Sequence, residues 1–427
     1  MKRAMILFAK GFPYNVSEPF LEKEYPKYKE YFDHVLVVTG YKKGEKPTRQ
    51  VEDDTLEFIN DYTLSGDVFS VLQAVPLMLS DRMFYREIAQ LIREKRCTFG
   101  RLRQLFSVSL CGNHRALQAR KWIRSHPEYH VDVIYSYWLQ ITAYAAVRLK
   151  QLEKLDDAFS ISRTHRFDLY AERMKSNYLP FQRQMVEQLD EIASISLDGK
   201  QYLESKYGTN HNISICRLGA QDRGITNPAS ARNTLRIVSC ARAVPIKRLD
   251  RIVEALKEIK DIPIEWTHIG GGECLDSIRE DACELPDNIH VKFTGIVSND
   301  EVYQIYSSEP FHVFVNVSKS EGVPVSIMEA MSFSIPVIAT AVGGTAELVD
   351  DKKNGFLLDE NFRTEELVDL LYKFYQMPEE EYIRFRMDAR SKFKAQYDAE
   401  HNYAEFVKGL AEKTEKRYDK NSYHHNT

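Results

Sequence analysis

Two glutamates, Glu321 and Glu329, lie eight positions apart in the stretch Ser320–Met331. A loop containing Gly322 separates the first carboxylate from a predicted helix that carries the second. Backbone N–H groups of such a loop and of a helix N-terminus attract an anion. The two carboxylates can accept hydrogen bonds from hydroxyl groups beside that anion. A diphosphate flanked by hydroxyl-rich rings, as in a nucleotide sugar, has this combination of groups.

Glu329 also has an interpretation that needs no ligand. Ser326 and Glu329 fit the capping box, in which Ser caps a helix and the Glu at N3 reaches back to the cap. Glu321 precedes this motif and adjoins Gly322, where the sequence gives a carboxylate no evident structural role. Both interpretations remain open for Glu329.

Two cations follow another predicted strand. Arg242 and Lys247 lie five positions apart, directly after the apolar run Arg236–Ala241. An arginine can hold phosphate oxygens bidentately, and a lysine adds a point charge. Together they would neutralise a diphosphate and stabilise it as a leaving group. Surface charge at a strand end is the alternative, but the carboxyl end of a strand is where open α/β sheets bind ligands.

The positions of these residues depend on the predicted strands that precede them. Short apolar runs alternate with helical patterns along the chain. Continuous apolar strands of this kind indicate parallel sheets covered on both faces. Two series in a chain of 427 residues predict two doubly wound α/β domains. The predicted strands are Met5–Ala9, Val35–Thr39, Val131–Tyr135, Ala158–Ser162, Ile192–Ser196, Arg236–Ala241, Ile264–Ile269, His290–Thr294, Val313–Asn316 and Pro336–Ala339.

The polar segment Gln221–Asn233, with its Gly and Pro, predicts the junction between the domains. We therefore expect an N-terminal Rossmann-like domain over residues 1–220 and a C-terminal one over 221–400. A helix and tail over 401–427 would follow. The N-terminal domain would carry a helical, basic insertion at about 62–130, because strand signals are absent there. Two such domains facing each other form a cleft, the usual position of a ligand site.

Composition excludes several classes of protein. The formal net charge of -4 gives no signal for nucleic-acid binding. The six cysteines are scattered without a Cys-x-x-Cys pair, which argues against a zinc site and a disulfide framework. The apolar run after Lys2 and Arg3 is too short for a signal-peptide core. Val68–Leu79 is too short for a membrane span. We therefore expect a cytoplasmic protein.

The segment 82–124 is strongly basic: eleven Lys and Arg against two Glu give a local net charge of +9. Apolar residues are interleaved with these charges. A basic amphipathic surface can bind an anionic membrane, which predicts peripheral contact with the inner face of the plasma membrane. A solvated helical face balanced by acids elsewhere in the fold is the alternative.

The second half of the chain resembles the donor domain of the family 4 glycosyltransferases, retaining enzymes of the GT-B fold. The resemblance covers about residues 235–360 and rests on an ordered set of motifs. These are Ala241-Arg242 through Lys247, Ile269–Gly272, Phe293–Val297, Ser320–Pro324, Glu329–Met331, Pro336–Thr340, Gly343–Glu347 and Asn354–Leu357.

The resemblance implies a role for each motif. Arg242 and Lys247 would bind the donor diphosphate, Glu321 the donor sugar, and Glu329 the hydroxyls of ribose or sugar. One departure is Arg248, where the family usually has Gly, so we expect a backbone there that needs no positive φ. The full donor-binding set is Arg242, Lys247, Gly322, Val323, Pro324, Val325, Glu329, Gly11 and Val297.

The first half resembles the same family less closely. Ser162–Tyr170 is similar to the His-x-x-Asp region of enzymes that build bacterial exopolysaccharide or lipopolysaccharide. There His165 would lie against the donor sugar and Asp168 would support the site, which makes His165, Asp168 and Glu321 the catalytic candidates. A hydrogen-bonded histidine at a strand end is the alternative for His165. Glu18 is a candidate acceptor contact, and Trp138 suits sugar stacking and core packing equally.

The family implies transfer of a sugar from a UDP- or GDP-linked donor, with retention of configuration, to a glycan or lipid-linked oligosaccharide. The setting would be bacterial cell-surface polysaccharide synthesis. No Asp-x-Asp sequence occurs, so we expect no metal and no cofactor. A front-face attack, in which the leaving phosphate takes the acceptor proton, is the implied mechanism. The alternatives are a sugar-nucleotide epimerase of the same fold and a non-catalytic donor-binding subunit of a polysaccharide assembly complex.

Overall fold

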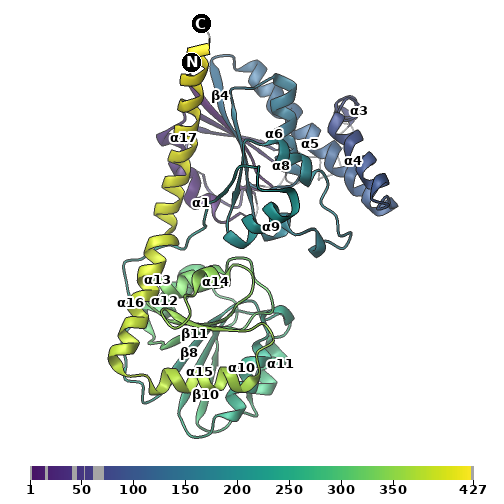
Figure 1. Cartoon of the computed structure of the whole chain (residues 1–427). Coiled ribbons are helices and arrows are strands. Elements are labelled where there is room, and N and C mark those ends of the chain that lie inside the picture. The colour runs from purple at the N-terminus through teal and green to yellow at the C-terminus, as the bar shows by residue number, and fades with distance from the viewer. Residues whose placement is uncertain (1, 15–17, 41–45, 52, 61–71, 425–427) are drawn as a thin grey trace. The chain divides into compact units, whose positions relative to one another are not determined.

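The computed structural model describes residues 2–14, 18–40, 46–51, 53–60 and 72–424 (Figure 1). The chain forms two compact units. Unit 1 comprises Met1–Cys216 together with Tyr403–Thr427, and unit 2 comprises Arg217–Asn402. The residues that follow the second unit thus return to the first, whereas the sequence had suggested a separate terminal segment over 401–427.

Unit 1 is built on a seven-stranded sheet in the order β3-β2-β1-β4-β5-β6-β7. Every strand pair in it is parallel. The order runs in opposite directions on either side of the β1–β4 pair, which makes the carboxyl ends of β1 and β4 a topological switch point. The strands are β1 (Lys2–Phe8), β2 (His34–Thr39), β3 (Leu56–Asn60), β4 (Tyr129–Ser136), β5 (Phe159–Thr164), β6 (Glu191–Ser194) and β7 (Ile213–Ile215).

Helices pack against this sheet and form separate hydrophobic clusters with it. The small side chains of Ala116 and Ala119 let α5 approach the buried residues of β1 and β4. Val407 and Leu410 of α17 pack into another hydrophobic cluster of unit 1. The helices are α1 (Leu21–Glu24), η1 (Tyr25–Glu30), α3 (Val75–Leu79), α4 (Arg82–Arg93), α5 (Phe99–Ser125), α6 (Ile141–Glu153), α7 (Arg166–Leu169), η3 (Ala171–Arg173), α8 (Gln182–Gln188), α9 (Leu197–Tyr207) and α17 (Ala399–His424).

Unit 2 repeats the plan with a six-stranded parallel sheet in the order β10-β9-β8-β11-β12-β13. Its switch point lies between β8 and β11. The strands are β8 (Leu235–Cys240), β9 (Ile264–Ile269), β10 (Ile289–Phe293), β11 (Val313–Asn316), β12 (Val337–Thr340) and β13 (Gly355–Leu358). The helices are η4 (Pro245–Lys247), α10 (Leu249–Glu258), α11 (Leu275–Ala282), α12 (Asn299–Ser308), α13 (Val325–Ser332), α14 (Thr345–Leu348), α15 (Thr364–Gln376) and α16 (Glu379–Gln396).

The predicted fold class, two parallel doubly wound α/β domains, is confirmed, and all ten predicted strands are present within a few residues. Strands β3, β7 and β13 were not predicted. Each residue of β3 is only half-buried, so its sequence Leu-Glu-Phe-Ile-Asn lacks a continuous apolar run. Strand β7 has three residues and β13 begins with a glycine, and both features weaken a strand signal.

The basic segment 82–124 divides into two parts with different roles. Arg120 and Arg124 form ion pairs with Glu153, and Arg115 is buried. Helix α5 therefore belongs to the layer that covers the sheet and is not a surface insertion as a whole. Arg82, Arg86 and Arg93 of α4 are exposed and form no ion pair with any described residue.

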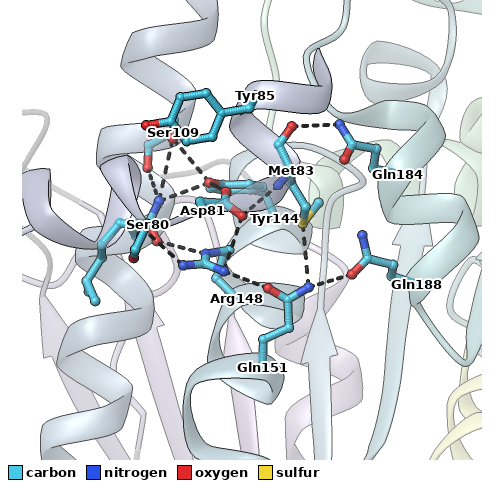
Figure 2. Close-up of polar contacts among 12 residues, drawn as sticks. Ser80, Asp81, Met83, Tyr85, Ser109, Tyr144, Arg148, Gln151, Gln184 and Gln188 are labelled. Atoms are coloured by element: carbon cyan, nitrogen blue, oxygen red, sulfur yellow. Dashed lines mark hydrogen bonds and ion pairs between the residues drawn. The ribbon is translucent and has the colours of Figure 1, made fainter. Parts of the chain in front are cut away.

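A buried polar network fixes α4 to α5 and α6 (Figure 2). Asp81 caps α4 by accepting a hydrogen bond of 2.9 Å from the amide of Met83. The same carboxylate accepts a hydrogen bond from the Tyr144 hydroxyl and pairs with Arg148 at 3.2 Å. Arg148 also donates to Asn113 of α5 at 2.9 Å. Because these groups satisfy one another away from water, the network holds the helices in one arrangement.

Among the helices of the described residues, none combines the length and the apolar character that a membrane crossing requires.

Candidate functional site

The first group of candidate residues lies at the switch point of unit 2. Lys247 ends η4 after β8, and Glu321 lies in the loop after β11. The Lys247 ammonium forms an ion pair with Glu321 Oε1 at 2.5 Å, and Asn316 Nδ2 donates to the same oxygen at 3.3 Å. The side chain of Glu321 is 7% exposed and that of Lys247 is 22% exposed. The structure therefore brings these two predicted residues together, with the ammonium on the more accessible side.

Arg242 is the second cation of this group. It lies two residues after β8, and its side chain is exposed. It forms no ion pair with another described residue, so its guanidinium is available to bind an anion in solution.

The loop after β11 is held by close backbone packing from the loop after β12. Gly343 has φ +53°, and a Cβ atom there would lie 2.2 Å from the carbonyl oxygen of Glu321. The amide of Gly344 donates to the Gly322 carbonyl at 2.7 Å. Only glycine fits these positions.

Two backbone amides of the loop after β11 have no hydrogen-bond acceptor among the described residues. The N–H groups of Gly322 and Val323 have no hydrogen-bond acceptor in the described part of the chain. Pro324 is the N-cap of α13, and Val325 is the first residue of that helix. Unpaired amides next to a helix N-terminus attract an anion. Lys247, which pairs with the preceding Glu321, adds a positive charge to the same loop.

Glu329 does not form the capping box that the sequence permits. The N-cap of α13 is Pro324, and no side chain caps this helix. The Glu329 carboxylate instead accepts a hydrogen bond of 2.7 Å from Asn299 Nδ2 at the start of α12. Val297 lies two residues before Asn299 in the loop that follows β10. Burial raises the pKa of Glu329 to about 7, and the bond from Asn299 opposes that rise.

Arg248 contradicts the expectation of an ordinary backbone at this position. Its φ is +50°, in the left-handed region. Its guanidinium donates to the carbonyls of Val317 at 2.7 Å, Glu360 at 2.7 Å and Ser318 at 3.3 Å. Three such bonds offset the cost of about 1 kcal/mol or more that a non-glycine residue has in this conformation. The loop therefore keeps a shape that glycine normally allows.

A second group of candidate residues lies at the switch point of unit 1, after β1 and β4. The Glu18 carboxylate accepts hydrogen bonds from the amides of Lys10 at 2.7 Å, Gly11 at 3.0 Å and Phe12 at 2.8 Å. The Trp138 indole N–H donates to it as well, at 2.7 Å. Glu18 is 3% exposed, so four donors satisfy a buried carboxylate. The Gly11 amide thus already has an acceptor.

Trp138 connects this group to His165. The centroids of the Trp138 and His165 rings lie 4.5 Å apart, and the Tyr137 ring lies 4.9 Å from that of His165. His165 is 7% exposed, and neither of its ring nitrogens has a hydrogen-bond partner. Burial and the nearby Arg163 charge lower its pKa well below the ordinary value, so the imidazole is neutral at pH 7. The role of His165 in ligand binding stays a prediction, and an unpaired ring nitrogen would suit a ligand hydroxyl.

Asp168 holds the backbone of His165 in place by a hydrogen bond. Its carboxylate accepts hydrogen bonds from the His165 amide at 2.6 Å, the Leu139 amide at 2.7 Å and the Thr164 hydroxyl at 3.1 Å. Asp168 is completely buried, and burial raises its pKa to about 7. It is thus a positioning residue, because no face of its carboxylate is open to a ligand.

The predicted residues therefore fall into two groups, one in each unit. His165, Asp168 and Gly11 belong to unit 1, and the remaining predicted residues belong to unit 2. The sequence did not reveal the contacts of Asn299 with Glu329 or of Glu18 with Trp138, because each joins residues from separate segments. The contact of Asn316 with Glu321 joins residues only five positions apart, so that spacing is the signal that could have indicated it. No cluster of three or more His, Cys, Asp or Glu able to hold a metal ion occurs within the described ranges.

Known proteins resemble this chain in sequence and in fold. The sequence profile of the family Glycosyl transferases group 1 matches residues 225–392. The putative colanic acid biosynthesis glycosyltransferase WcaL of Escherichia coli strain K12 is 27% identical over 244 residues, which is 53% of this chain and 58% of WcaL. The chain thus matches just over half the length of this curated relative.

Two solved structures share the fold over nearly the whole chain. The lipopolysaccharide outer core galactosyltransferase WaaB superposes with a TM-score of 0.68 at 12% identity, covering 97% of this chain and 99% of WaaB. Anabaena HepE in complex with UDP gives a TM-score of 0.65 at 16% identity, covering 96% of this chain and 100% of HepE. The fold is therefore that of the GT-B enzymes.

Proposed function

We propose, from the premise that residues 225–392 form a domain of the group 1 glycosyl transferases, that this chain transfers a sugar from a nucleotide-sugar donor. One observation carries the proposal. Lys247, Glu321, Arg242 and the unpaired amides of Gly322 and Val323 gather at the switch point of the sheet in that same domain. This combination suits a diphosphate joined to a hydroxyl-bearing ring.

In the proposed reaction the bond between the anomeric carbon and the donor phosphate oxygen breaks, and a bond from the acceptor oxygen to that carbon forms. Arg242, Lys247 and the amides stabilise the negative charge on the departing diphosphate. The acceptor proton passes to the phosphate oxygen that leaves. Attack occurs on the face from which the phosphate departs, so the configuration of the sugar is retained. NMR of the product anomer tests this outcome, and an inverted anomer would overturn it.

We further propose that no metal is needed, because protein cations and amides supply the charge that a divalent ion would otherwise supply. Support comes from Arg242 and Lys247 lying on the same switch-point loop after β8. Transfer should continue at an unchanged rate in the presence of excess EDTA. A loss of transfer that added Mg²⁺ restores would contradict this part of the proposal.

The acceptor is proposed to be a glycan or lipid-linked oligosaccharide of bacterial surface polysaccharide synthesis, and the similarity to WcaL, a putative colanic acid biosynthesis glycosyltransferase, supports that setting. Helix α4 supports contact with an anionic membrane, because exposed Arg82, Arg86 and Arg93 accompany Tyr85 and Ile92, which are 53% and 60% exposed. Cosedimentation with phosphatidylglycerol vesicles should fall in the triple variant Arg82→Glu/Arg86→Glu/Arg93→Glu. Unchanged sedimentation would contradict contact of α4 with the membrane.

A thermal-shift screen tests donor binding. UDP, GDP, ADP and their sugar conjugates are added to the wild type and to Glu321→Ala. One nucleotide should raise the melting temperature of both proteins, since a ligand that binds the folded state stabilises it by mass action. The additional shift produced by the sugar conjugate should be lost in Glu321→Ala. No shift with any nucleotide would contradict donor binding.

A further inference from the structure

The Glu18 side chain holds the loop that follows β1 in unit 1. Its carboxylate accepts hydrogen bonds from three consecutive backbone amides, those of Lys10, Gly11 and Phe12. Successive N–H groups that point at one spot form a concave site for an anion. Here the protein's own carboxylate fills that site, and Glu18 is 3% exposed. The Glu18 carboxylate is therefore an internal anion of unit 1.

The backbone of Glu18 shows how firmly this carboxylate is held. Its φ is +66°, in the left-handed region, which is unfavourable for a residue that has a Cβ atom. Hydrogen bonds from amides to an ionised carboxylate are stronger than those between neutral groups. The contacts of the side chain therefore hold the backbone of Glu18 in a conformation that it would not otherwise favour.

The fourth donor to Glu18 comes from a neighbouring strand. The indole N–H of Trp138, two residues after β4, donates at 2.7 Å to the oxygen that also accepts from the Lys10 amide. Strands β1 and β4 are adjacent in the sheet, so Glu18 joins the loops at their carboxyl ends. An indole has a single donor. Because Glu18 binds that donor, it fixes the edge of a ring that is only half-buried.

The ring of Trp138 lies against the ring of His165. Their centroids are 4.5 Å apart and their planes are inclined at 41°, and the Tyr137 ring is 4.9 Å from that of His165. Both nitrogens of His165 are buried and have no hydrogen-bond partner among the described residues. The orientation of a histidine ring is usually set by a hydrogen bond to one nitrogen. Here the packing of the two aromatic rings sets it instead.

The backbone next to Trp138 is tied to the same turn. The Leu139 amide donates to the Asp168 carboxylate at 2.7 Å, and that carboxylate also accepts from the His165 amide at 2.6 Å. The segment that carries Trp138 therefore contacts both the ring and the backbone of His165. A change in the position of the indole would be transmitted to the imidazole over one contact.

We propose that Glu18 is a positioning residue for sugar transfer, which acts through the Trp138 indole on the His165 imidazole. The carboxylate stays in its site of backbone amides and takes no proton from the substrate. The inference rests on the proposed function, because it adds a residue on which that reaction depends. It assigns to the loop after β1 the task of orienting a side chain that follows β5.

NMR of the full chain tests the contact without an activity assay. In Glu18→Gln a neutral amide replaces the carboxylate, so the indole N–H has a weaker acceptor. The indole resonance of Trp138, assigned with Trp138→Phe, should move upfield. The ring protons of His165 should shift as well, because they lie beside the indole and feel its ring current. Unchanged His165 signals in Glu18→Gln would overturn the proposal.

The chain offers a matched control for this substitution. Glu57 of β3 accepts a hydrogen bond of 2.7 Å from the indole N–H of Trp122, a residue of α5. Glu57→Gln thus weakens the same kind of bond at another place in unit 1. It should leave the His165 signals and the rate of transfer unchanged. Equal effects of Glu57→Gln and Glu18→Gln would show a general loss of structure and overturn the proposal.

A double-mutant cycle tests whether the effect passes through the indole. Trp138→Phe keeps an aromatic ring but removes the N–H. Glu18→Gln and Trp138→Phe should each lower kcat about tenfold, since a small misplacement of a reacting group slows the reaction. The double variant should also lose about tenfold, because both changes break one contact. A loss near a hundredfold would show independent effects and overturn action through Trp138.

The KM for the nucleotide sugar should stay within about twofold of the wild type in all three variants, because unit 2 binds the nucleotide. Nucleotide thermal shifts on the same proteins show that each variant is folded. If Glu18→Gln is not folded, Trp138→Phe tests the same contact from its other side. If the wild type transfers sugar and both single variants do so at the wild-type rate, this inference fails and the proposed function stands.

Discussion

Lys247 and Glu321, which lie 74 residues apart in the sequence, form an ion pair at the switch point of unit 2. The partners come from the loops after β8 and β11, two strands that are neighbours in the sheet. The carboxylate is nearly buried while the ammonium is partly exposed. In the proposed function, a bound diphosphate would contact the Lys247 ammonium while the Glu321 carboxylate holds that ammonium in place.

Removal of the cation should affect the leaving group. Lys247→Met should lower the affinity for the nucleoside diphosphate about tenfold and the rate of transfer about a hundredfold, since charge on the phosphate grows as the bond breaks. Titration calorimetry and a transfer assay measure the two effects. Lys257→Met, a change at an exposed pair with Glu284, should leave both unchanged. Equal effects of the two substitutions would contradict a role in the site.

His165 should act as a neutral imidazole. Burial and the nearby Arg163 charge lower its pKa well below the ordinary value, so the ring is neutral at pH 7. NMR of a ¹⁵N-histidine sample should show a neutral ring at pH 7 and a titration midpoint below the ordinary value, and a midpoint near 6.5 would contradict the structure. His165→Phe should reduce transfer about a hundredfold by removing both nitrogens. Nucleotide binding should remain within about twofold of the wild type, because unit 2 binds the nucleotide in this account.

Glu329 should make stability depend on pH. Its pKa is raised to about 7 in the folded chain from an ordinary value near 4.5, so the folded state binds the proton more tightly than the unfolded state. The stabilising effect is fully present below pH 4.5 and is lost as pH rises through 7. Relative to Glu329→Gln, the wild type should lose roughly 3 kcal/mol between pH 4.5 and 8.

Denaturant titrations of both proteins across this range measure the difference. The comparison with Glu329→Gln isolates this residue, because Asp168 also has a pKa of about 7 and titrates in both proteins. A stability difference that does not change with pH would contradict the raised pKa of Glu329.

The buried pair of Asp81 and Arg148 should be essential to the packing of α4, α5 and α6. Arg148→Met leaves the Asp81 carboxylate buried without its cation and should cost about 3 kcal/mol of unfolding free energy. Lys408→Met breaks an exposed pair with Glu412 on α17 and should cost less than about 0.5 kcal/mol. Chemical denaturation measures both variants. Comparable small losses would show that the network in Figure 2 does not stabilise unit 1.

Much of this architecture could be predicted from the sequence because it depends on local patterns. Buried parallel strands such as β2, with the run Val35–Val38, are continuous apolar runs, and the order of motifs in residues 235–360 indicated the donor domain. Arg242, Lys247 and Glu321 could be selected because they follow such strands. The half-buried strand β3 and the three-residue β7 have no such pattern and were missed.

The remaining features depend on contacts between distant segments. The left-handed backbone at Arg248 is possible because the carbonyls of Val317 and Glu360 accept hydrogen bonds from its guanidinium. The sequence around Arg248 does not contain that information. Similarly, Ser326 and Glu329 have the spacing of a capping box, yet the Glu329 carboxylate accepts a hydrogen bond from Asn299 of another helix.

The most direct test of the central claim is acceptor-dependent release of nucleoside diphosphate by the purified chain. The assay contains EDTA, a panel of nucleotide sugars and a lipid-linked oligosaccharide as acceptor. We predict release from one nucleotide sugar by the wild type only when acceptor is present, and at least about a hundredfold less release by Lys247→Met. Absence of acceptor-dependent release with every nucleotide sugar, or equal release by the wild type and Lys247→Met, would contradict the account.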